Sequence, residues 1–362
     1  MTSLPLAQMR TVPCFLELGR DGVASLLESR DPKPAMRARQ LERWILLGRA
    51  TDFSQMSDLP ASLRLELPEF LVPISSTVAK RSIASDGTRK LLVRLADGQS
   101  VETVLMLEDD RRTVCISTQV GCGMGCTFCA SGLNGVARNL KPHEMVEQLL
   151  LARNELPEAE RLTHIVVMGM GEPMANLSNL LEALAVATSP KGLGISSRHV
   201  TISTVGIPSR MLELADSGRK YHLAVSLHAP EDALRTRLMP TNEKTGISSI
   251  LDAAAEFLAK TGRQVTFEYI LLGGINDRAQ HAEALARLLE GRRAHVNLIP
   301  FNPVDGLPWR RPDKEAVSMF RQALEARQVT ATVRKRKGAD IDAACGQLRR
   351  QSEESLQSKP VG

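Results

Sequence analysis

The segment VGCGMGCTFC, residues 120–129, places three cysteines in a loop rich in glycine and other small residues. Cys122, Cys126 and Cys129 have C-x3-C-x2-C spacing, and the glycines let the backbone wrap closely around a metal centre. Three thiolates suit a [4Fe-4S] cluster that keeps one iron open. A structural zinc ion would need a fourth ligand, and the nearest histidine, His143, is expected in the following helix. Three inert core cysteines are the remaining alternative, although such cysteines rarely cluster with glycines.

The cysteine loop directly follows a short apolar run, and from Thr113 onward such runs alternate with amphipathic segments. This alternation predicts parallel strands joined by helices, in a sheet that is open or closed as a partial barrel. Chemistry is expected in the loops after the carboxyl ends of the strands. A further strand at 330–334 is expected to lead into a loop and a short helix containing Cys345. Six β/α units are expected, with strands at 114–118, 165–168, 200–203, 223–227, 265–271 and 296–299.

The residues before the cysteine loop predict different structure. Residues 33–49 read as an amphipathic helix, with Leu41, Trp44 and Ile45 on one side. Two β-prone runs follow, at 90–95 and 101–106, on either side of an Ala-Asp-Gly turn. We therefore expect a small helical region and then a β connector.

Composition narrows the class of protein. A hydrophobic fraction of 43% over 362 residues can fill a sizeable core, and no run is long and apolar enough to span a bilayer. The net charge of +5 makes a polyanion a plausible partner, with basic residues concentrated at 334–337 and 349–350. Aromatic residues are only 3% of the chain, which disfavours an RNA reader built on stacked side chains. Six cysteines without an even distribution indicate a reducing cytoplasm rather than a secreted disulfide scaffold.

A second Gly-rich turn, residues 168–176, follows the second expected strand and contains Gly171 and Glu172. Such a turn lets a ligand approach the backbone, and its carboxylate can accept hydrogen bonds from an ammonium group. An ordinary tight turn is the alternative. Later strand ends carry further residues that are expected to line the same mouth, namely Ser203, Ser226, Leu227, His228 and Asn302.

The cysteine loop, with an aromatic residue before its last cysteine and a β/α core around it, resembles the radical S-adenosylmethionine (SAM) superfamily. The resemblance implies a partial (β/α)6 barrel in which the open iron binds SAM. Further motifs narrow it to the family of bacterial dual-specificity 23S rRNA and tRNA adenine-C2 methyltransferases. These motifs are VCISTQVGC at 114–122, GEP at 171–173, SLHAP at 226–230, NLIP at 297–300 and AACGQL at 343–348, and the similarity runs from the Trp44 helix to Leu348.

The family resemblance implies a mechanism that consumes two SAM molecules per turnover. Cys345 accepts a methyl group from the first SAM. A radical generated from the second SAM removes a hydrogen from that S-methyl group, and the carbon then adds to C2 of adenine. Cys115 attacks the Cys345 sulfur and releases methylated adenine through a transient disulfide. Glu102 matches the proton acceptor of the family, whereas as an isolated residue in a β-prone run it reads as solvent-facing.

The resemblance also implies partners and domains. The substrates are the 23S rRNA peptidyl transferase centre and the tRNA adenine next to the anticodon, and a flavodoxin or ferredoxin donates electrons. Unstacked adenines in loops are favoured over duplex RNA. We expect a cytoplasmic monomer with no membrane contact. Its expected parts are a helical RNA-contacting domain at 1–72, a β connector at 73–112, a radical SAM domain at 113–328, a strand and catalytic-cysteine segment at 329–350, and a disordered tail at 351–362.

Two alternatives remain open. The sister enzyme that methylates adenine C8 and confers antibiotic resistance is expected to share the cluster and both working cysteines. An RNA-binding or electron-transfer module with a purely structural cluster would leave Cys115 and Cys345 without a role.

Overall fold

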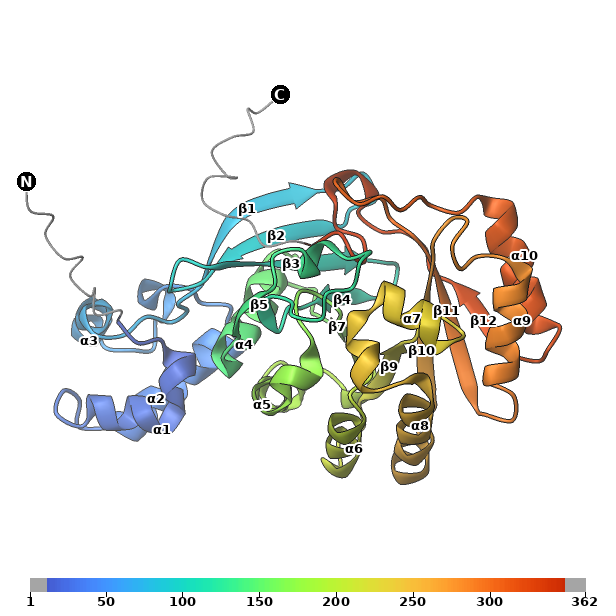
Figure 1. The fold of residues 1–362 in the computed structure, drawn as a ribbon. Coiled ribbons are helices and arrows are strands. Elements are labelled where there is room, and N and C mark those ends of the chain that lie inside the picture. The colour runs from blue at the N-terminus through green and yellow to red at the C-terminus, as the bar shows by residue number, and fades with distance from the viewer. Residues whose placement is uncertain (1–11, 349–362) are drawn as a thin grey trace, which may run out of the picture.

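The computed structural model describes residues 12–348, which form a ten-stranded sheet with helices packed against it (Figure 1). Seven neighbouring strands run parallel, and the two ends of the ten-strand row do not pair with each other. The parallel strands are β4 (Arg112–Cys115), β7 (His164–Val167), β8 (Val200–Thr204), β9 (His222–Ser226), β10 (Val265–Leu271), β11 (Ala294–Pro300) and β12 (Thr330–Val333). The predicted partial barrel with six β/α units is confirmed, and β12 adds a seventh parallel strand.

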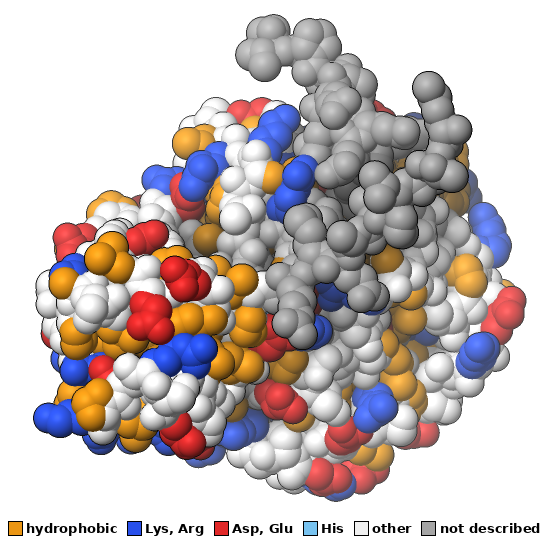
Figure 2. All heavy atoms as spheres, turned by 90° about the vertical axis from the view of Figure 1, so that its left-hand side faces the viewer, with side chains coloured by type: hydrophobic (Ala, Val, Ile, Leu, Met, Phe, Trp, Pro, Cys, Tyr) orange, Lys and Arg blue, Asp and Glu red, His pale blue; other side chains and the backbone are white. Residues whose placement is uncertain are grey.

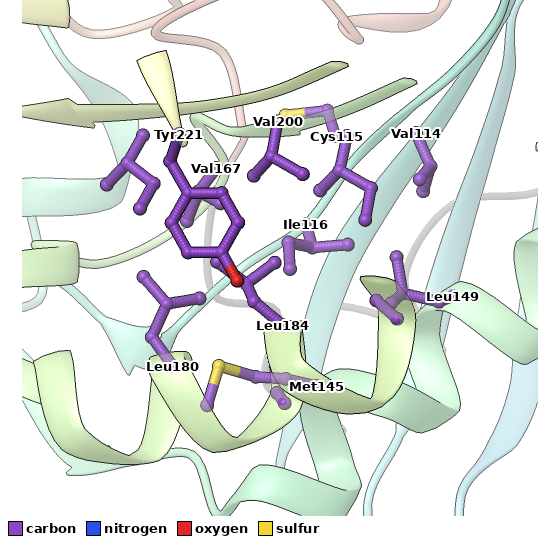
Figure 3. Packing of buried hydrophobic residues seen from close by; sticks show 14 of the residues in the cluster. Val114, Cys115, Ile116, Met145, Leu149, Val167, Leu180, Leu184, Val200 and Tyr221 are labelled. Carbon is purple, nitrogen blue, oxygen red and sulfur yellow. The ribbon is translucent and has the colours of Figure 1, made fainter. Parts of the chain in front are cut away.

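Helices follow the strands in turn and cover the outer face of the sheet (Figure 1). They are α4 (Pro142–Asn154), α5 (Leu177–Thr188), α6 (Pro208–Asp216), α8 (Ile247–Thr261), α9 (Ala279–Leu288) and α10 (Lys314–Glu325), with the short α7 (Asp232–Leu238) between β9 and α8. Apolar side chains fill the space between strands and helices. Figure 3 shows Ile116 beside β4 facing Met145 of α4 and Leu184 of α5, all fully buried. Burial of each such side chain contributes roughly 1.5–3 kcal/mol.

Three antiparallel strands extend the sheet on one side. They are β1 (Thr77–Ile83), β2 (Arg89–Arg94) and β3 (Ser100–Leu107), and β3 pairs antiparallel with β4. The expected hairpin around the Ala-Asp-Gly turn is present as β2 and β3. The segment from 77 to 107 therefore continues the barrel sheet, so its inward-facing side chains belong to the barrel interior.

The N-terminal helices α1 (Phe15–Leu27), α2 (Pro34–Leu46) and α3 (Ala61–Glu66) form a separate cluster beside α4 (Figure 1). Two arginines attach this cluster to the barrel. Arg153 of α4 donates to the carbonyls of Ile45 and Leu46 at the end of α2, where helix carbonyls lack partners within the helix. Arg49 donates to carbonyls after α4, including that of Leu156 at 2.8 Å.

After β12 the chain crosses toward the β1–β2 hairpin. The predicted short helix around Cys345 is wrong: a 3-10 helix, Ala339–Ile341, ends before it, and Cys345 lies in a turn. Asp342 and Gly346 have positive φ values of 51° and 84°, a conformation that ends a regular helix. The basic pair at 349–350 and the expected tail at 351–362 lie outside the described residues. None of the helices within 12–348 is long and apolar enough to cross a membrane.

Candidate active site

Two adjoining cavities open at the carboxyl ends of the parallel strands. The cluster cavity, about 870 Å³ counted out to its open mouth, is large enough for a nucleoside ligand. Its lining includes Cys122, Cys126, Cys129, Gly171, Glu172, Ser203, Ser226, His228, Glu268, Arg334 and Cys345. The cysteine cavity is lined by residues that include Cys115, Asn302, Arg334 and Cys345. Arg334 and Cys345 border both cavities, so the two form one continuous site.

A small hairpin, β5 (Gln119–Gly121) and β6 (Val136–Asn139), holds the cysteine loop. Gly121 has φ +81°, and a Cβ placed on it would lie 2.1 Å from the carbonyl oxygen of Gly135. No other residue fits there without moving the backbone. The Cys122 amide donates to that same carbonyl at 3.0 Å, so the hairpin closes directly onto the first cysteine.

The three loop cysteines lie in a low-dielectric environment. Burial raises the pKa of Cys122 to about 11 and raises the pKa values of Cys126 and Cys129, and neighbouring thiols add to the rise at Cys122 and Cys126. A metal centre removes such protons outright, because the thiolate is the ligand. Three cysteines lining one cavity, on a loop that admits only glycine at position 121, fit a [4Fe-4S] cluster, and they would leave one of its irons without a cysteine ligand.

Glu172 is buried at the floor of the turn that follows β7. Its carboxylate accepts hydrogen bonds from the Thr204 hydroxyl at 2.6 Å, the Val205 amide at 2.9 Å and the Met174 amide at 3.0 Å. Burial raises its pKa, and these three donors oppose the rise. A carboxylate offers about four acceptor positions, so roughly one remains for a ligand. Glu172 therefore joins the loops after β7 and β8 as well as facing the cavity.

His228 contacts the cavity from a strained position after β9. Its φ is +61°, rare for a residue with a side chain, and such strain persists at functional sites when the surroundings enforce it. Nδ1 accepts a hydrogen bond from the Ile270 amide at 3.0 Å, which leaves Nε2 as the protonated nitrogen. Burial, together with nearby Arg235, lowers the pKa of His228 to about 3, so the ring is neutral at physiological pH.

Arg235 of α7 is an organising residue that the sequence alone did not reveal. Its guanidinium is buried and donates to the backbone carbonyls of Val205, Ser226 and Leu227 at 2.6–3.1 Å. It thereby ties the loops after β8 and β9 together beside the cysteine loop. Leu227, one of the expected ligand residues, is fully buried and supplies a carbonyl to Arg235.

Cys115 and Cys345 lie far apart in the sequence yet line the same cavity. Cys115 is the last residue of β4, and its sulfur is turned away from the helix layer (Figure 3). Burial, with Cys345 nearby, raises its pKa to about 12. Asn302 donates to the Cys345 carbonyl at 3.1 Å and lines the cysteine cavity, so its contact is with the Cys345 turn.

The Cys345 turn is hydrogen-bonded to the cysteine loop. The Ala130 amide, next to Cys129, donates to the Gly346 carbonyl at 2.8 Å, and the Ser131 hydroxyl donates to the Leu348 carbonyl at 2.6 Å. A shift of one loop therefore moves the other.

Glu102 lies at the edge of this site. It is buried in β3, on the same face as Val104 and Met106, which line the cysteine cavity. Its Oε1 is 3.1 Å from the ammonium group of Lys90, and Lys90 also donates to the Asp342 carbonyl at 3.1 Å. Glu102 is thus linked through Lys90 to the turn that carries Cys345, and it is not solvent-facing.

His143, considered above as a zinc ligand, belongs to a different group. Its ring lies with Cys14 and Glu17 at the junction of α1 and α4, their ligand atoms within 4.8 Å of one another. Existing contacts account for this group: the Cys14 sulfur accepts from the Glu17 amide at 3.3 Å, and Glu17 pairs with Lys141 at 2.7 Å. It lies outside both cavities and carries no part of the active site.

Some of the basic residues near the site form ion pairs with acidic side chains. Arg334 is 3.8 Å from Glu268, and Lys337 is 3.4 Å from Glu108. On the N-terminal side of the molecule, Figure 2 shows basic and acidic side chains interspersed where the surface is coloured. Within that helical cluster Arg37 pairs with Asp31 and Arg43 with Asp58, so several arginines have internal partners.

Comparisons with known proteins match both the N-terminal helices and the barrel. The sequence profile of the Radical SAM superfamily matches residues 116–289, and that of the Ribosomal RNA large subunit methyltransferase N-terminal domain matches residues 15–72. The "Probable dual-specificity RNA methyltransferase RlmN" of Rhodopirellula baltica is 53% identical over 336 residues, covering 93% of this chain and 90% of that protein. The protein of the same name in Symbiobacterium thermophilum is 46% identical over 348 residues, covering 94% of each.

A solved structure is similar over nearly the whole fold. The crystal structure of a radical SAM methyltransferase from Sphaerobacter thermophilus superposes with a TM-score of 0.88 at 43% sequence identity. The match covers 92% of this chain and 98% of that one, so it includes the N-terminal helices as well as the barrel.

Proposed function

The chain belongs to the RlmN family of radical SAM RNA methyltransferases, and from that membership we propose that it methylates C2 of adenine in 23S rRNA and in tRNA. One observation carries the proposal. Cys115 and Cys345, which are 230 positions apart in the sequence, line a single cavity that adjoins the cavity of the three cluster cysteines. A binding module with a structural cluster has no use for this pair.

Cys345 is the proposed methyl acceptor. Its thiolate forms a bond to the methyl carbon of SAM while the carbon–sulfonium bond breaks, and S-adenosylhomocysteine leaves. Cys122, Cys126 and Cys129 would hold a [4Fe-4S] cluster, which with a second SAM would supply the radical chemistry that removes one hydrogen from the S-methyl group. The Cys345 turn is hydrogen-bonded to the loop of Cys129, and this contact would keep a methyl group on Cys345 near that source.

Cys115 is the proposed resolving cysteine. After the methylene radical has added to adenine C2, the adduct would lose one electron to the iron–sulfur site and its C2 proton to a base. The Cys115 thiolate would then attack the Cys345 sulfur to form a disulfide, and the released carbon would keep the electron pair of the broken sulfur–carbon bond and take up a proton to become the methyl group. The electron donor would reduce the disulfide before the next turnover. Glu102, placed beside this cavity and linked to Lys90, is the proposed acceptor of the C2 proton. The ligand residues proposed for SAM are Gly171, Glu172, Ser203, Ser226, Leu227, His228 and Asn302.

We further propose the wider setting from family membership. RNA would contact the helical domain at 1–72 and the basic run at 334–337, and the segment 73–112 would connect that domain to the radical SAM domain at 113–328. A flavodoxin or ferredoxin would reduce the cluster. The protein would act as a monomer in the cytoplasm, where its RNA substrates are found.

The test is methylation of defined RNA by the anaerobically reconstituted enzyme. A 23S rRNA fragment and a tRNA are incubated separately with SAM and a reducing system, and the modified carbon is identified by mass spectrometry of the nucleosides. We expect 2-methyladenosine from both RNAs. Exclusive 8-methyladenosine would instead assign the chain to the sister C8 activity, and absence of 5′-deoxyadenosine would contradict radical chemistry altogether.

A further inference from the structure

A carboxylate stands in the middle of the barrel interior, where side chains are usually apolar. Glu268 lies on β10 between Phe267 and Tyr269 and is only 3% exposed. Strand alternation points its side chain into the barrel together with Ile270, and both line the cluster cavity. The interior of such a barrel is normally packed with branched apolar residues. A buried charge at this depth requires a specific partner.

Glu268 belongs to a row of polar residues that crosses neighbouring strands. In the sheet register it pairs with Ser226 of β9 on one side and with Asn297 of β11 on the other. Asn297 pairs in turn with Thr332 of β12. The Asn297 amide donates to Glu268 Oε1 at 3.1 Å, and the Thr332 hydroxyl donates to Asn297 Oδ1 at 2.5 Å. These hydrogen bonds fix the orientation of the Glu268 carboxylate through its Oε1 atom.

The other oxygen, Oε2, has no hydrogen-bond donor among the described residues. Arg334 forms an ion pair with this oxygen, but its Nη1 lies 3.8 Å away, too far for a hydrogen bond. That same Nη1 is 3.3 Å from the sulfur of Met168. Leaving a buried acceptor unsatisfied is costly. Because Glu268 lines the cluster cavity, a ligand bound there can supply the donor that the protein does not.

Glu268 has more free acceptor capacity than Glu172, the other carboxylate of the cluster cavity. Glu172 accepts three hydrogen bonds from the protein, whereas Glu268 accepts one. Of these two carboxylates, Glu268 therefore leaves more acceptor positions open to a ligand in the cavity. Adjacent Ser226 offers a hydroxyl at the end of β9, in register with it.

We propose that Glu268 is a further binding residue of the site, and that its Oε2 accepts hydrogen bonds from the vicinal ribose hydroxyls of the nucleoside ligand. This inference rests on the proposed use of SAM. A carboxylate with one oxygen fixed and one open matches a vicinal diol, the pairing that acidic residues make with ribose in nucleotide sites. Burial raises the pKa of Glu268, and the hydroxyl donors stabilise its ionised form when the ligand binds.

The experiment combines one protein change with one ligand change. Affinities of the reconstituted holoenzyme are measured by anaerobic calorimetry for S-adenosylhomocysteine and for its 2′-deoxy and 3′-deoxy analogues. The wild type is compared with Glu268→Gln, which keeps the shape and the contact to Asn297. Glu315→Gln, at an exposed carboxylate in the first turn of α10, is the control. Absorbance of the cluster and thermal unfolding confirm that each variant is loaded and folded.

We expect the wild type to lose affinity roughly 10–100-fold when a hydroxyl is removed, as for other hydrogen bonds to a charged group. Glu268→Gln should bind S-adenosylhomocysteine weaker by a similar factor and show little further loss with the deoxy analogues. The control should match the wild type.

Equal penalties for the deoxy analogues in the wild type and in Glu268→Gln would overturn the inference, because independent effects multiply whereas contacting groups do not. In that case Glu268 would only hold Arg334, and SAM binding itself would stand. A wild-type holoenzyme that binds no S-adenosylhomocysteine would contradict the proposed function and the inference with it.

Discussion

Cys345 and Cys115 reach the same cavity from different kinds of backbone, a turn and a paired strand. Cys115 ends a strand paired on both sides, with Val104 and Val166 opposite it. Cys345 lies in a turn between two residues of positive φ, held by Asn302 and by the loop after Cys129. A methyl-carrying group must approach both a radical source and a substrate, whereas the cysteine that resolves the adduct needs one fixed position. The placement suits the roles proposed for the two cysteines.

The two cysteines should fail in different ways. Cys345→Ser should reduce RNA methylation by at least about 1000-fold, because serine is a poor methyl acceptor at neutral pH. Cys115→Ser should accumulate a covalent protein–RNA adduct, visible as a shifted band on a denaturing gel. Cys14→Ser, at a buried cysteine outside both cavities, is the matched control and should retain activity. An adduct in Cys345→Ser would contradict the assignment.

His228 should make the protein less stable in acid. Its pKa is about 3 in the folded protein and about 6.5 in an unfolded chain. Between these two pH values the unfolded state therefore binds a proton at His228 that the folded state does not bind. This contribution to stability is present above pH 6.5 and is lost as the pH falls from about 6.5 to about 3. Between pH 7 and 5.5 the loss is about 1 kcal/mol.

The measurement is urea unfolding of the apoprotein at both pH values, for the wild type and for His228→Asn. Asparagine tolerates the positive φ and has no titrating group. The wild type should lose about 1 kcal/mol more than the variant over this range. Identical losses in the two proteins would show that His228 titrates normally.

At the level of elements, α7 does more than connect β9 to α8. It is too short to cover a strand, yet Arg235 extends from it to the carbonyls at the ends of β8 and β9. The buried guanidinium also lies near Cys126, so a positive charge stands beside the cysteine loop. Burial lowers the pKa of Arg235 to about 10, which leaves it charged at neutral pH.

Removal of this guanidinium should destabilise the whole site. Arg235→Met leaves several buried carbonyls without donors, at roughly 1–3 kcal/mol each, so the free energy of unfolding should fall by about 3 kcal/mol or more. Arg237→Met, on the same helix but exposed, should change it by less than about 0.5 kcal/mol. Chemical denaturation measures the free energy of unfolding of both variants. Equal values for Arg235→Met and Arg237→Met would mean that the loops do not depend on Arg235.

At the scale of the whole molecule, the open barrel is bridged by the C-terminal segment. The sheet begins at β1 and ends at β12, which do not pair. After β12, the Gly338 amide donates to Asp86 at 3.1 Å, and Asp340 accepts from the Ser85 amide at 2.9 Å. These contacts join the β1–β2 hairpin to the segment that carries Cys345. The position of Cys345 therefore depends on both edges of the sheet.

Weakening the bridge should expose Cys345. Asp86→Ala removes acceptors for Gly338 and Thr88, and a cost of roughly 1 kcal/mol should raise the rate at which Cys345 is alkylated several-fold. The rate of Cys345 alkylation is measured by peptide mass spectrometry after timed iodoacetamide treatment of the holoenzyme. Asp110→Ala, at an exposed turn, is the control. An unchanged rate at Cys345 would show that the turn is held without the hairpin.

Local sequence patterns by themselves determined the class of fold and the presence of a metal-binding loop. The alternation of apolar runs and amphipathic segments determined the parallel sheet and its six β/α units, because period and length report which face of each element is buried. Dense cysteines with glycines determined a metal loop. Family motifs brought Cys115 and Cys345 together as a hypothesis, since nothing in their local sequence joins them.

Only the tertiary structure decided how the site is held. Arg235 looks like any arginine in a polar helix, and only the fold turns it toward three carbonyls of other loops. Glu268 stands alone as a charge within the apolar run 265–272, but its open oxygen is visible only when neighbouring strands are in register. Glu102, whose local pattern suggests exposure, is buried because β3 joins the barrel sheet. Such contacts join residues far apart in sequence, and hydrophobic periodicity carries no information about them.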